Sequence, residues 1–140
     1  MGKVQIIAVL TMDGCLSSEL YDKAHQDLCL DRCGLDEIRK KAFYRVTPDY
    51  SISMLHEWRK DCTNIRYLAE ATPDTADYIN GLLRMHAVDE IILYTVPFIS
   101  GSGRHFFKSA LPEQHWTLSS LKSYPNGVCR IIYILDKKAR

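Results

Sequence analysis

A long hydrophobic run is missing from this 140-residue sequence. The longest apolar stretch, around residues 91–96, is far shorter than the roughly 20 residues that cross a bilayer. Residues 1–7 carry one positive charge and run on toward an Asp-Gly turn instead of a small-residue cleavage site. We therefore expect no signal peptide, no transmembrane helix and no membrane partner.

An excess of charge of either sign is also missing. Lys and Arg total 18 and Asp and Glu total 17, which leaves a formal net charge of +1. The basic residues are scattered, except for a small cluster near the carboxyl terminus formed by Lys137, Lys138 and Arg140. Nucleic-acid-binding domains carry a basic patch or stripe, so we predict no nucleic-acid partner.

Cysteine is odd in number, with five residues and none of the close pairs typical of zinc sites. Disulfide frameworks of secreted proteins use even counts, so reduced thiols in the cytoplasm fit the sequence best. Cys29 and Cys33 can share a helix face with His25, one turn earlier. A metal site there competes with ordinary helix packing; packing is the better explanation, and we predict no metal.

What is present is an alternation of strand and helix patterns. Residues 3–11 are rich in Val, Ile, Ala and Leu, as in a central strand buried on both faces, and the Asp-Gly pair that follows predicts a turn. The remaining patterns predict strands at 42–47, 64–68 and 88–96, and helices at 19–30, 35–40 and 51–61.

A fourth helix has the sharpest predicted start. Thr72 is a capping residue, Pro73 suits the first helical position and Asp74 suits the first turn, so the helix is expected to run from there to about His86. Segments 116–124 and 128–135 flank Pro125-Asn126-Gly127, which predicts a hairpin. The whole is expected to be one α/β domain over residues 1–140, with a mostly parallel central sheet flanked by helices and an antiparallel C-terminal hairpin.

Several segments form an ordered set of motifs. The opening strand ends in Asp13-Gly14, and the chain later has Val88-Asp89-Glu90, a hydrophobic strand, Val96-Pro97 and then Gly101-Ser102-Gly103. Phe106-Phe107 and the final hairpin follow. In content and order these segments resemble the C-terminal reductase domain of the bacterial riboflavin-specific deaminase/reductase (RibD), a member of the dihydrofolate reductase superfamily. The resemblance implies a dihydrofolate reductase-like fold, a homodimer, and an oxidoreductase that uses NADPH (an NADP cofactor) in riboflavin biosynthesis or on a pteridine.

The resemblance also implies site residues. Ala8, Thr72, Thr75, Ala76, Gly101 and Gly103 match positions that bind the cofactor, and Thr11, Asp13 and Gly14 match positions beside a pteridine- or pyrimidine-like substrate. A plain turn accounts equally for Asp13-Gly14. Core packing is the alternative for Ala8, and a flexible turn explains Gly101-Ser102-Gly103. The catalytic residue is unknown, because the acids and bases at 19–27 also read as solvated helix residues.

The chain departs from the family pattern at the cofactor phosphates. The Gly-rich turn of the family falls on Asp74-Thr75-Ala76, which contains no glycine, and an aspartate there opposes a pyrophosphate by like charge. The family's Gly-Arg-x-Thr segment is missing as well. Two hypotheses follow: an NADPH-dependent reductase, or a non-catalytic or altered-ligand homodimeric relative that has lost dinucleotide binding.

Overall fold

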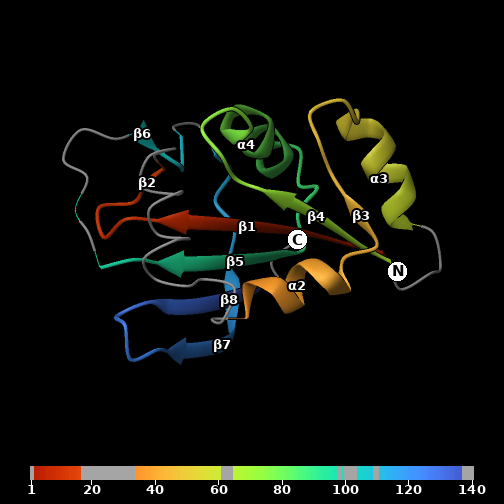
Figure 1. The fold of residues 1–140 in the computed structure, drawn as a ribbon. Helices are drawn as coiled ribbons and strands as arrows, with labels where there is room; N and C mark the ends of the chain where they lie inside the picture. The colour runs from red at the N-terminus through yellow and green to blue at the C-terminus, as the bar shows by residue number, and fades with distance from the viewer. Residues whose placement is uncertain are drawn as a thin grey trace.

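Strand β1 (Lys3–Leu10) forms the centre of the fold in a computed structural model of the chain (Figure 1). It pairs in parallel with β4 (Arg66–Glu70) on one side and with β5 (Glu90–Thr95) on the other. Every residue of β1 after Lys3 is buried, because each of its faces is covered. The prediction of a central strand buried on both faces is confirmed.

The structure describes residues 2–16, 34–60, 65–97, 99, 104–108 and 111–136. Its main sheet has six strands in the order β3-β4-β1-β5-β8-β7. The first four are parallel, and β8 (Cys129–Leu135) and β7 (Trp116–Ser123) add an antiparallel edge. The predicted α/β class, with a mostly parallel sheet and an antiparallel hairpin, is confirmed.

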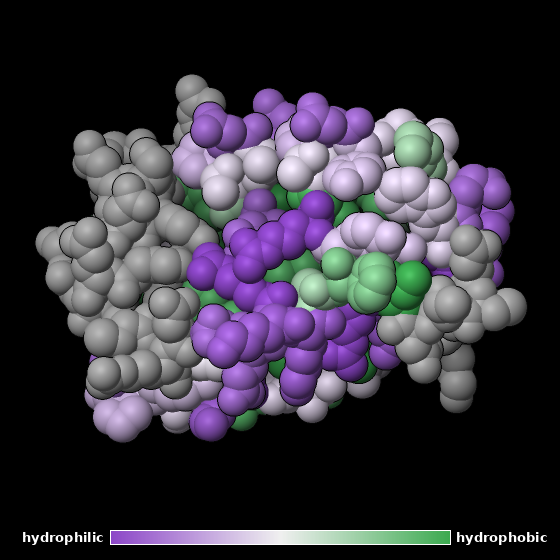
Figure 2. Space-filling view, turned by 45° about the vertical axis from the view of Figure 1, so that its right-hand side comes forward, coloured by the Kyte–Doolittle hydropathy of each residue, from purple (hydrophilic) through white to green (hydrophobic). Residues whose placement is uncertain are grey.

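The helices cover both faces of the sheet (Figure 1). Helices α3 (Ile52–Lys60) and α4 (Ala76–Arg84) lie on the face formed by the even-numbered residues of β1, and α2 (Leu35–Lys41) lies on the opposite face. Ile79 and Leu82 of α4 are fully buried, and burial of a side chain of this size contributes about 1.5–3 kcal/mol. Figure 2 shows one face of the molecule, on which hydrophilic surface predominates and hydrophobic surface is exposed in small areas.

The predicted start of α4 is wrong by several residues. The helix begins at Ala76 with Thr75 as its N-cap residue, and residues 73–75 form a turn. The turn is held by side chains: the Thr72 N–H donates to Oγ1 of Thr75 (2.8 Å), and that hydroxyl donates to the carbonyl of Glu70 (2.8 Å). Because these groups close a turn, they do not cap a helix at Thr72. The helix also ends earlier than predicted, at Arg84.

Smaller differences concern the strands. The strand predicted at 64–68 lies at Arg66–Glu70, and the one predicted at 42–47 is reduced to β3 (Tyr44–Arg45) at the sheet edge. A second, two-stranded sheet pairs β2 (Cys15–Leu16) with β6 (Arg104–His105). It was not predicted, because two residues are too few to show an alternating pattern.

The Asn-Gly hairpin is confirmed, with a three-residue loop. The Gly127 N–H donates to the carbonyl of Tyr124 (3.0 Å), and Gly127 has a φ of 90°. A turn of this kind followed by a left-handed glycine is a common hairpin connection. Pro125 fits it, because the ring fixes a negative φ at the first loop position.

Several predictions lie outside the described residues: the helix at 19–30 with its acids and bases at 19–27, the metal alternative involving His25, Cys29 and Cys33, and the cofactor assignment of Gly101 and Gly103. Among the described residues, no group of three His, Cys, Asp or Glu side chains is placed to hold a metal. None of the described helices is long and apolar enough to cross a membrane. The cytoplasmic location stays a prediction.

Candidate functional site

The carboxyl ends of β1, β4 and β5 meet at one edge of the sheet (Figure 1). Open α/β sheets bind ligands in the crevice outside this edge. The turn after β1 and the segment after β4 both lie here, and these two segments contain six of the nine residues predicted to bind substrate or cofactor. This edge of the sheet therefore holds most of the predicted site.

The three predicted substrate residues lie together in the turn after β1. The Thr11 hydroxyl donates to the carboxylate of Asp13, and the Cys15 N–H donates to Oγ1 of Thr11 (3.0 Å). The Gly14 N–H donates to the Thr11 carbonyl (3.0 Å), and Gly14 has a φ of 78°. A left-handed φ favours glycine, so this residue lets the chain reverse. The turn fixes one carboxylate at the sheet edge.

This turn is joined to the second, small sheet. Sγ of Cys15 lies 3.4 Å from Nδ1 of His105 on the neighbouring strand β6, and the Phe106 N–H donates to the Gly14 carbonyl (3.1 Å). Burial raises the pKa of the Cys15 thiol, and the nearby Asp13 charge raises this pKa further. A protonated thiol is a poor nucleophile, so the pair does not form an activated cysteine.

The predicted cofactor residues after β4 form the tight turn described above. The Thr75 N–H donates to the carbonyl (3.1 Å) and to the hydroxyl (3.2 Å) of Thr72, so the two threonines satisfy much of each other's hydrogen bonding. The Thr75 hydroxyl donates a hydrogen bond to the backbone carbonyl of Glu70. The N–H groups of the first turn of α4, which begins at Ala76, have no carbonyl of their own helix to bond to, as at every helix start.

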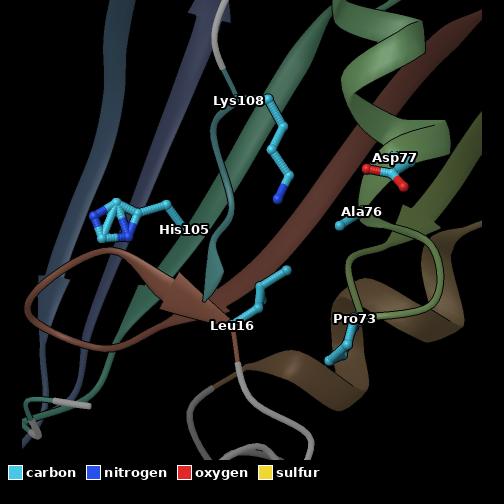
Figure 3. Close-up of a pocket in the computed structure, with 6 residues that line it drawn as sticks. All are labelled: Leu16, Pro73, Ala76, Asp77, His105 and Lys108. Atoms are coloured by element: carbon cyan, nitrogen blue, oxygen red, sulfur yellow. The ribbon is translucent and has the colours of Figure 1, made fainter. Parts of the chain in front are cut away.

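A pocket lies between this helix start and the segment that follows β6 (Figure 3). Its lining residues are Leu16, Pro73, Ala76, Asp77, His105 and Lys108. Figure 3 shows Lys108 and Asp77 on either side of the pocket, with Leu16 and Pro73 below them and His105 set apart from the other five. The volume open to the centre of a water molecule is about 20 Å³, which is room for about one water. The pocket is partly open, so a larger ligand would lie partly outside it.

Asn80 fixes one wall of this pocket. Its side chain is fully buried, and its Nδ2 donates to the carbonyls of Ala76 and Phe106, at 2.8 Å each. The Lys108 N–H donates to Oδ1 of the same amide (3.0 Å). One amide thus joins α4 to the segment that bears Lys108. A lone polar residue on the apolar stripe of a predicted helix is the sequence signal for this role, and Asn80 was not predicted from it.

On the α2 side of the same edge, Glu70 ends β4 between two arginines. Nε of Arg39 lies 2.5 Å from its Oε1, and Nη1 of Arg45 lies 3.9 Å from its Oε2. The side chains of Arg39 and Glu70 are about one-fifth exposed. These contacts join α2 and β3 to the end of β4, and they join residues too far apart in the chain for a spacing pattern to indicate.

The other predicted cofactor residues do not join the site. Ala8 is buried in the core on the α4 face, and it is paired with Leu93 of β5. Its assignment to a cofactor stays a prediction, and its position accords with core packing. Gly101 and Gly103 lie outside the described residues, so their assignment also stays a prediction. No role was predicted for Leu16, Asp77 or Lys108 from the sequence, although all three line the pocket.

No protein-family model matches the sequence. No curated protein matches it either. Similarity is found with solved structures. A putative riboflavin biosynthesis protein from Shewanella sp. PV-4 has a TM-score of 0.58 at 10% identity, over 96% of this chain and 99% of that chain.

RibD of Acinetobacter baumannii has a TM-score of 0.60 in its form 1, at 12% identity, over 98% of this chain and 59% of that chain. Form 2 gives a TM-score of 0.54 at 12% identity, over 97% and 58%. This chain thus spans about three-fifths of RibD. At these identities the similarity shows the fold, and the chain adopts the dihydrofolate reductase-like fold of these riboflavin biosynthesis proteins.

Proposed function

We propose that this protein is a reductase that transfers a hydride from NADPH to a small pyrimidine- or pteridine-like molecule, such as the ribosylaminopyrimidinone precursor of riboflavin. The main support is that the fold matches a putative riboflavin biosynthesis protein over nearly the whole of both chains. The turn at Thr11, Asp13 and Gly14 supplies a fixed carboxylate at the edge where such folds gather ligands. Fold alone does not dictate function, so a binding experiment is needed to test the proposed activity.

The residues that would hold NADPH are the first-turn N–H groups of α4 and the Lys108 side chain. A helix N-terminus favours anions, and Lys108 adds a positive charge on the facing wall. When bound, the cofactor would supply the hydride. Thr75 would hold the turn instead of a phosphate, because its hydroxyl proton is already donated to Glu70. Asp77 lines the same pocket and opposes a phosphate, so we expect weak binding.

The first experiment is calorimetric titration with NADPH at low salt, which leaves phosphate contacts unscreened. NADH, a flavin and a folate are titrated separately. Asp77→Asn should tighten NADPH binding about two- to fivefold, as expected for one charge at a helix N-terminus. Asp49→Asn changes an exposed aspartate before α3 and is the matched control. Absence of NADPH binding by the protein and by Asp77→Asn would contradict the reductase proposal.

A second candidate is an altered-ligand or non-catalytic relative. It is favoured by the turn from Thr72 to Thr75, which contains no glycine and satisfies its own hydrogen bonds. A triple change, Asp74→Gly, Thr75→Gly and Ala76→Gly, separates the candidates. A reductase that has drifted gains NADPH affinity from it, whereas a remodelled pocket does not. We expect little gain, because Thr75→Gly removes the hydroxyl that closes the turn.

We also infer that the protein forms a homodimer through the β7 edge. In the described sheet β7 is an outer strand, and Leu118 and Leu121 on it are 51% and 64% exposed. A long edge strand with exposed apolar residues is prone to pair with another chain, and a second copy offers the same edge in a two-fold arrangement. Light scattering should give a dimer mass for the protein and a monomer mass for Leu121→Lys. Met54→Lys, at an exposed residue of α3, is the control and should stay dimeric.

A further inference from the structure

Arg130 has a buried nitrogen without a partner. Its Nε is the one buried side-chain nitrogen or oxygen, among the described residues, that lacks a hydrogen bond. No carboxylate in the described part of the chain forms an ion pair with its guanidinium. A buried donor left unsatisfied destabilises a fold, so the burial of this nitrogen without a partner requires an explanation.

A second cation lies directly opposite. In the β7–β8 register Lys122 faces Arg130, and Arg130 faces Tyr94 of β5 on its other side. Like charges directly opposite on neighbouring strands repel each other. Nζ of Lys122 lies 5.2 Å from the ring centroid of Tyr124, at the start of the hairpin loop. Two positive charges and an aromatic ring are thus gathered where β8 begins, beside the carboxyl end of β5.

Polar atoms of this group converge on Gly34, at the start of α2. A β-carbon placed on Gly34 would lie 2.6 Å from Nη1 of Arg130, 3.6 Å from the hydroxyl oxygen of Tyr94 and 3.7 Å from that of Tyr124. Gly34 has a φ of 88°, which disfavours a side chain. The missing side chain therefore lets the guanidinium pack against the backbone of Gly34, with the two hydroxyl oxygens beside it.

We propose that Arg130 and Lys122, with the hydroxyl groups of Tyr94 and Tyr124, bind a compact oxyanion, the phosphate or carboxylate group of a small molecule. A guanidinium presents a planar fork of N–H donors that matches both oxyanions, and a phenol hydroxyl can donate to either. The anion offsets the repulsion between the cations. Asp36, on the first turn of α2, lies 3.0 Å from Lys40 and is paired with that cation.

This site is separate from the proposed cofactor site. Arg130 and Gly34 lie on the α2 side of the sheet, whereas Asp77 and Lys108 line a pocket on the α4 side. The inference goes beyond the proposed function and does not depend on NADPH binding. A failure of the NADPH titration therefore leaves it standing, and a failure of the experiment below leaves the reductase proposal standing.

The test is thermal unfolding in chloride, inorganic phosphate or acetate at equal ionic strength, which separates binding from screening. A bound anion stabilises the native state by mass action. We expect phosphate or acetate to raise the Tm of the protein by about 3 °C or more at tenfold the dissociation constant. The anion that raises the Tm identifies the acidic group of the ligand: a rise with phosphate alone indicates a phosphate, and a rise with acetate alone indicates a carboxylate.

The variants make the test specific. Arg130→Met should abolish the anion-dependent rise and, in chloride, should keep or raise the Tm, because a buried unpaired donor is removed. Arg66→Met, at an exposed arginine of β4, is the matched control and should keep the full rise. Arg130→Lys, which retains charge without the fork, and Tyr124→Phe should reduce the rise. Both variants keep the test valid if Arg130→Met does not fold. The proposal would be overturned if neither anion raised the Tm of the protein. It would also be overturned if the rise in Arg130→Met, or in both Arg130→Lys and Tyr124→Phe, were as large as in the unchanged protein.

Discussion

Arg59 of α3 and Asp89 before β5 form an ion pair at the amino end of the sheet, with Nη2 2.6 Å from Oδ1. Their side chains are 7% and 16% exposed. Asp89 also accepts a hydrogen bond from the N–H of Val4 (2.9 Å), and Arg59 donates to the carbonyl of His86 (2.7 Å). The pair therefore joins a helix to two strands at the end of the sheet opposite the candidate site.

Asp89→Asn is expected to destabilise the protein by about 3–5 kcal/mol, because it leaves the Arg59 charge buried without its counter-charge. Urea unfolding at neutral pH measures this. Asp36→Asn, in the exposed pair with Lys40, is the matched control and should cost no more than about 0.5 kcal/mol. Equal small losses in the two variants would show that the buried pair does not hold the fold.

Asn80→Leu is expected to loosen the segment that bears Lys108. The change removes the acceptor of the Lys108 N–H and the donor to the Phe106 carbonyl, and each buried group left unsatisfied costs about 1–3 kcal/mol. Hydrogen exchange should speed up at the Lys108 amide. The Val46 amide, which donates to the Leu68 carbonyl at 2.8 Å, is the internal reference and should keep its protection. Unchanged exchange at Lys108 would refute the role assigned to Asn80.

Thr75→Val tests the turn that replaces the predicted helix start. Valine keeps the side-chain shape but removes the hydroxyl that accepts from the Thr72 N–H and donates to the Glu70 carbonyl. Loss of these two hydrogen bonds should cost about 1–3 kcal/mol. Thr117→Val, at an exposed position of β7, is the control, and valine is well tolerated in strands. A variant as stable as this control would mean that the hydroxyl does not hold the turn.

Much of the fold was predictable because its signals are local. The run of branched and aliphatic residues in β1 reflects burial on two faces, and Asn126-Gly127 marks the hairpin. The motif at Val88-Asp89-Glu90 carried much of the resemblance. In the structure Asp89 joins β1 and α3, and Glu90 accepts from the Gln5 amide (3.2 Å). The motif therefore indicates the fold and does not indicate the chemistry of the site.

The site was less predictable because its contacts join distant parts of the chain. Cys15 and His105 are 90 residues apart, and Lys108 is fixed by Asn80, which is 28 residues away. The start of α4 was misassigned for a local reason: threonine hydroxyls suit both helix caps and turns. The choice between these two roles depends on the Glu70 carbonyl, which lies at the end of a strand.

Cys15 gives a prediction that depends on pH. Burial, and then the charge of Asp13, raise the pKa of its thiol above the ordinary 9.0, so the native state holds this proton more tightly than the unfolded state. The resulting stability is present below about pH 9 and is lost as the pH rises through the native pKa. Alkylation by iodoacetamide, followed by peptide mass spectrometry, should therefore increase at Cys15 only in alkaline solution.

Asp13→Asn should lower the pKa of the Cys15 thiol, because it removes the carboxylate charge while Thr11 can still donate to the amide oxygen. The alkylation profile of Cys15 should then move to lower pH, and the alkaline loss of stability should shrink. Cys129, on β8, is also a free thiol and serves as the reference, since Asp13→Asn should leave its profile unchanged. Identical Cys15 profiles with and without the carboxylate would show that Asp13 does not act on the thiol and that burial alone sets its reactivity.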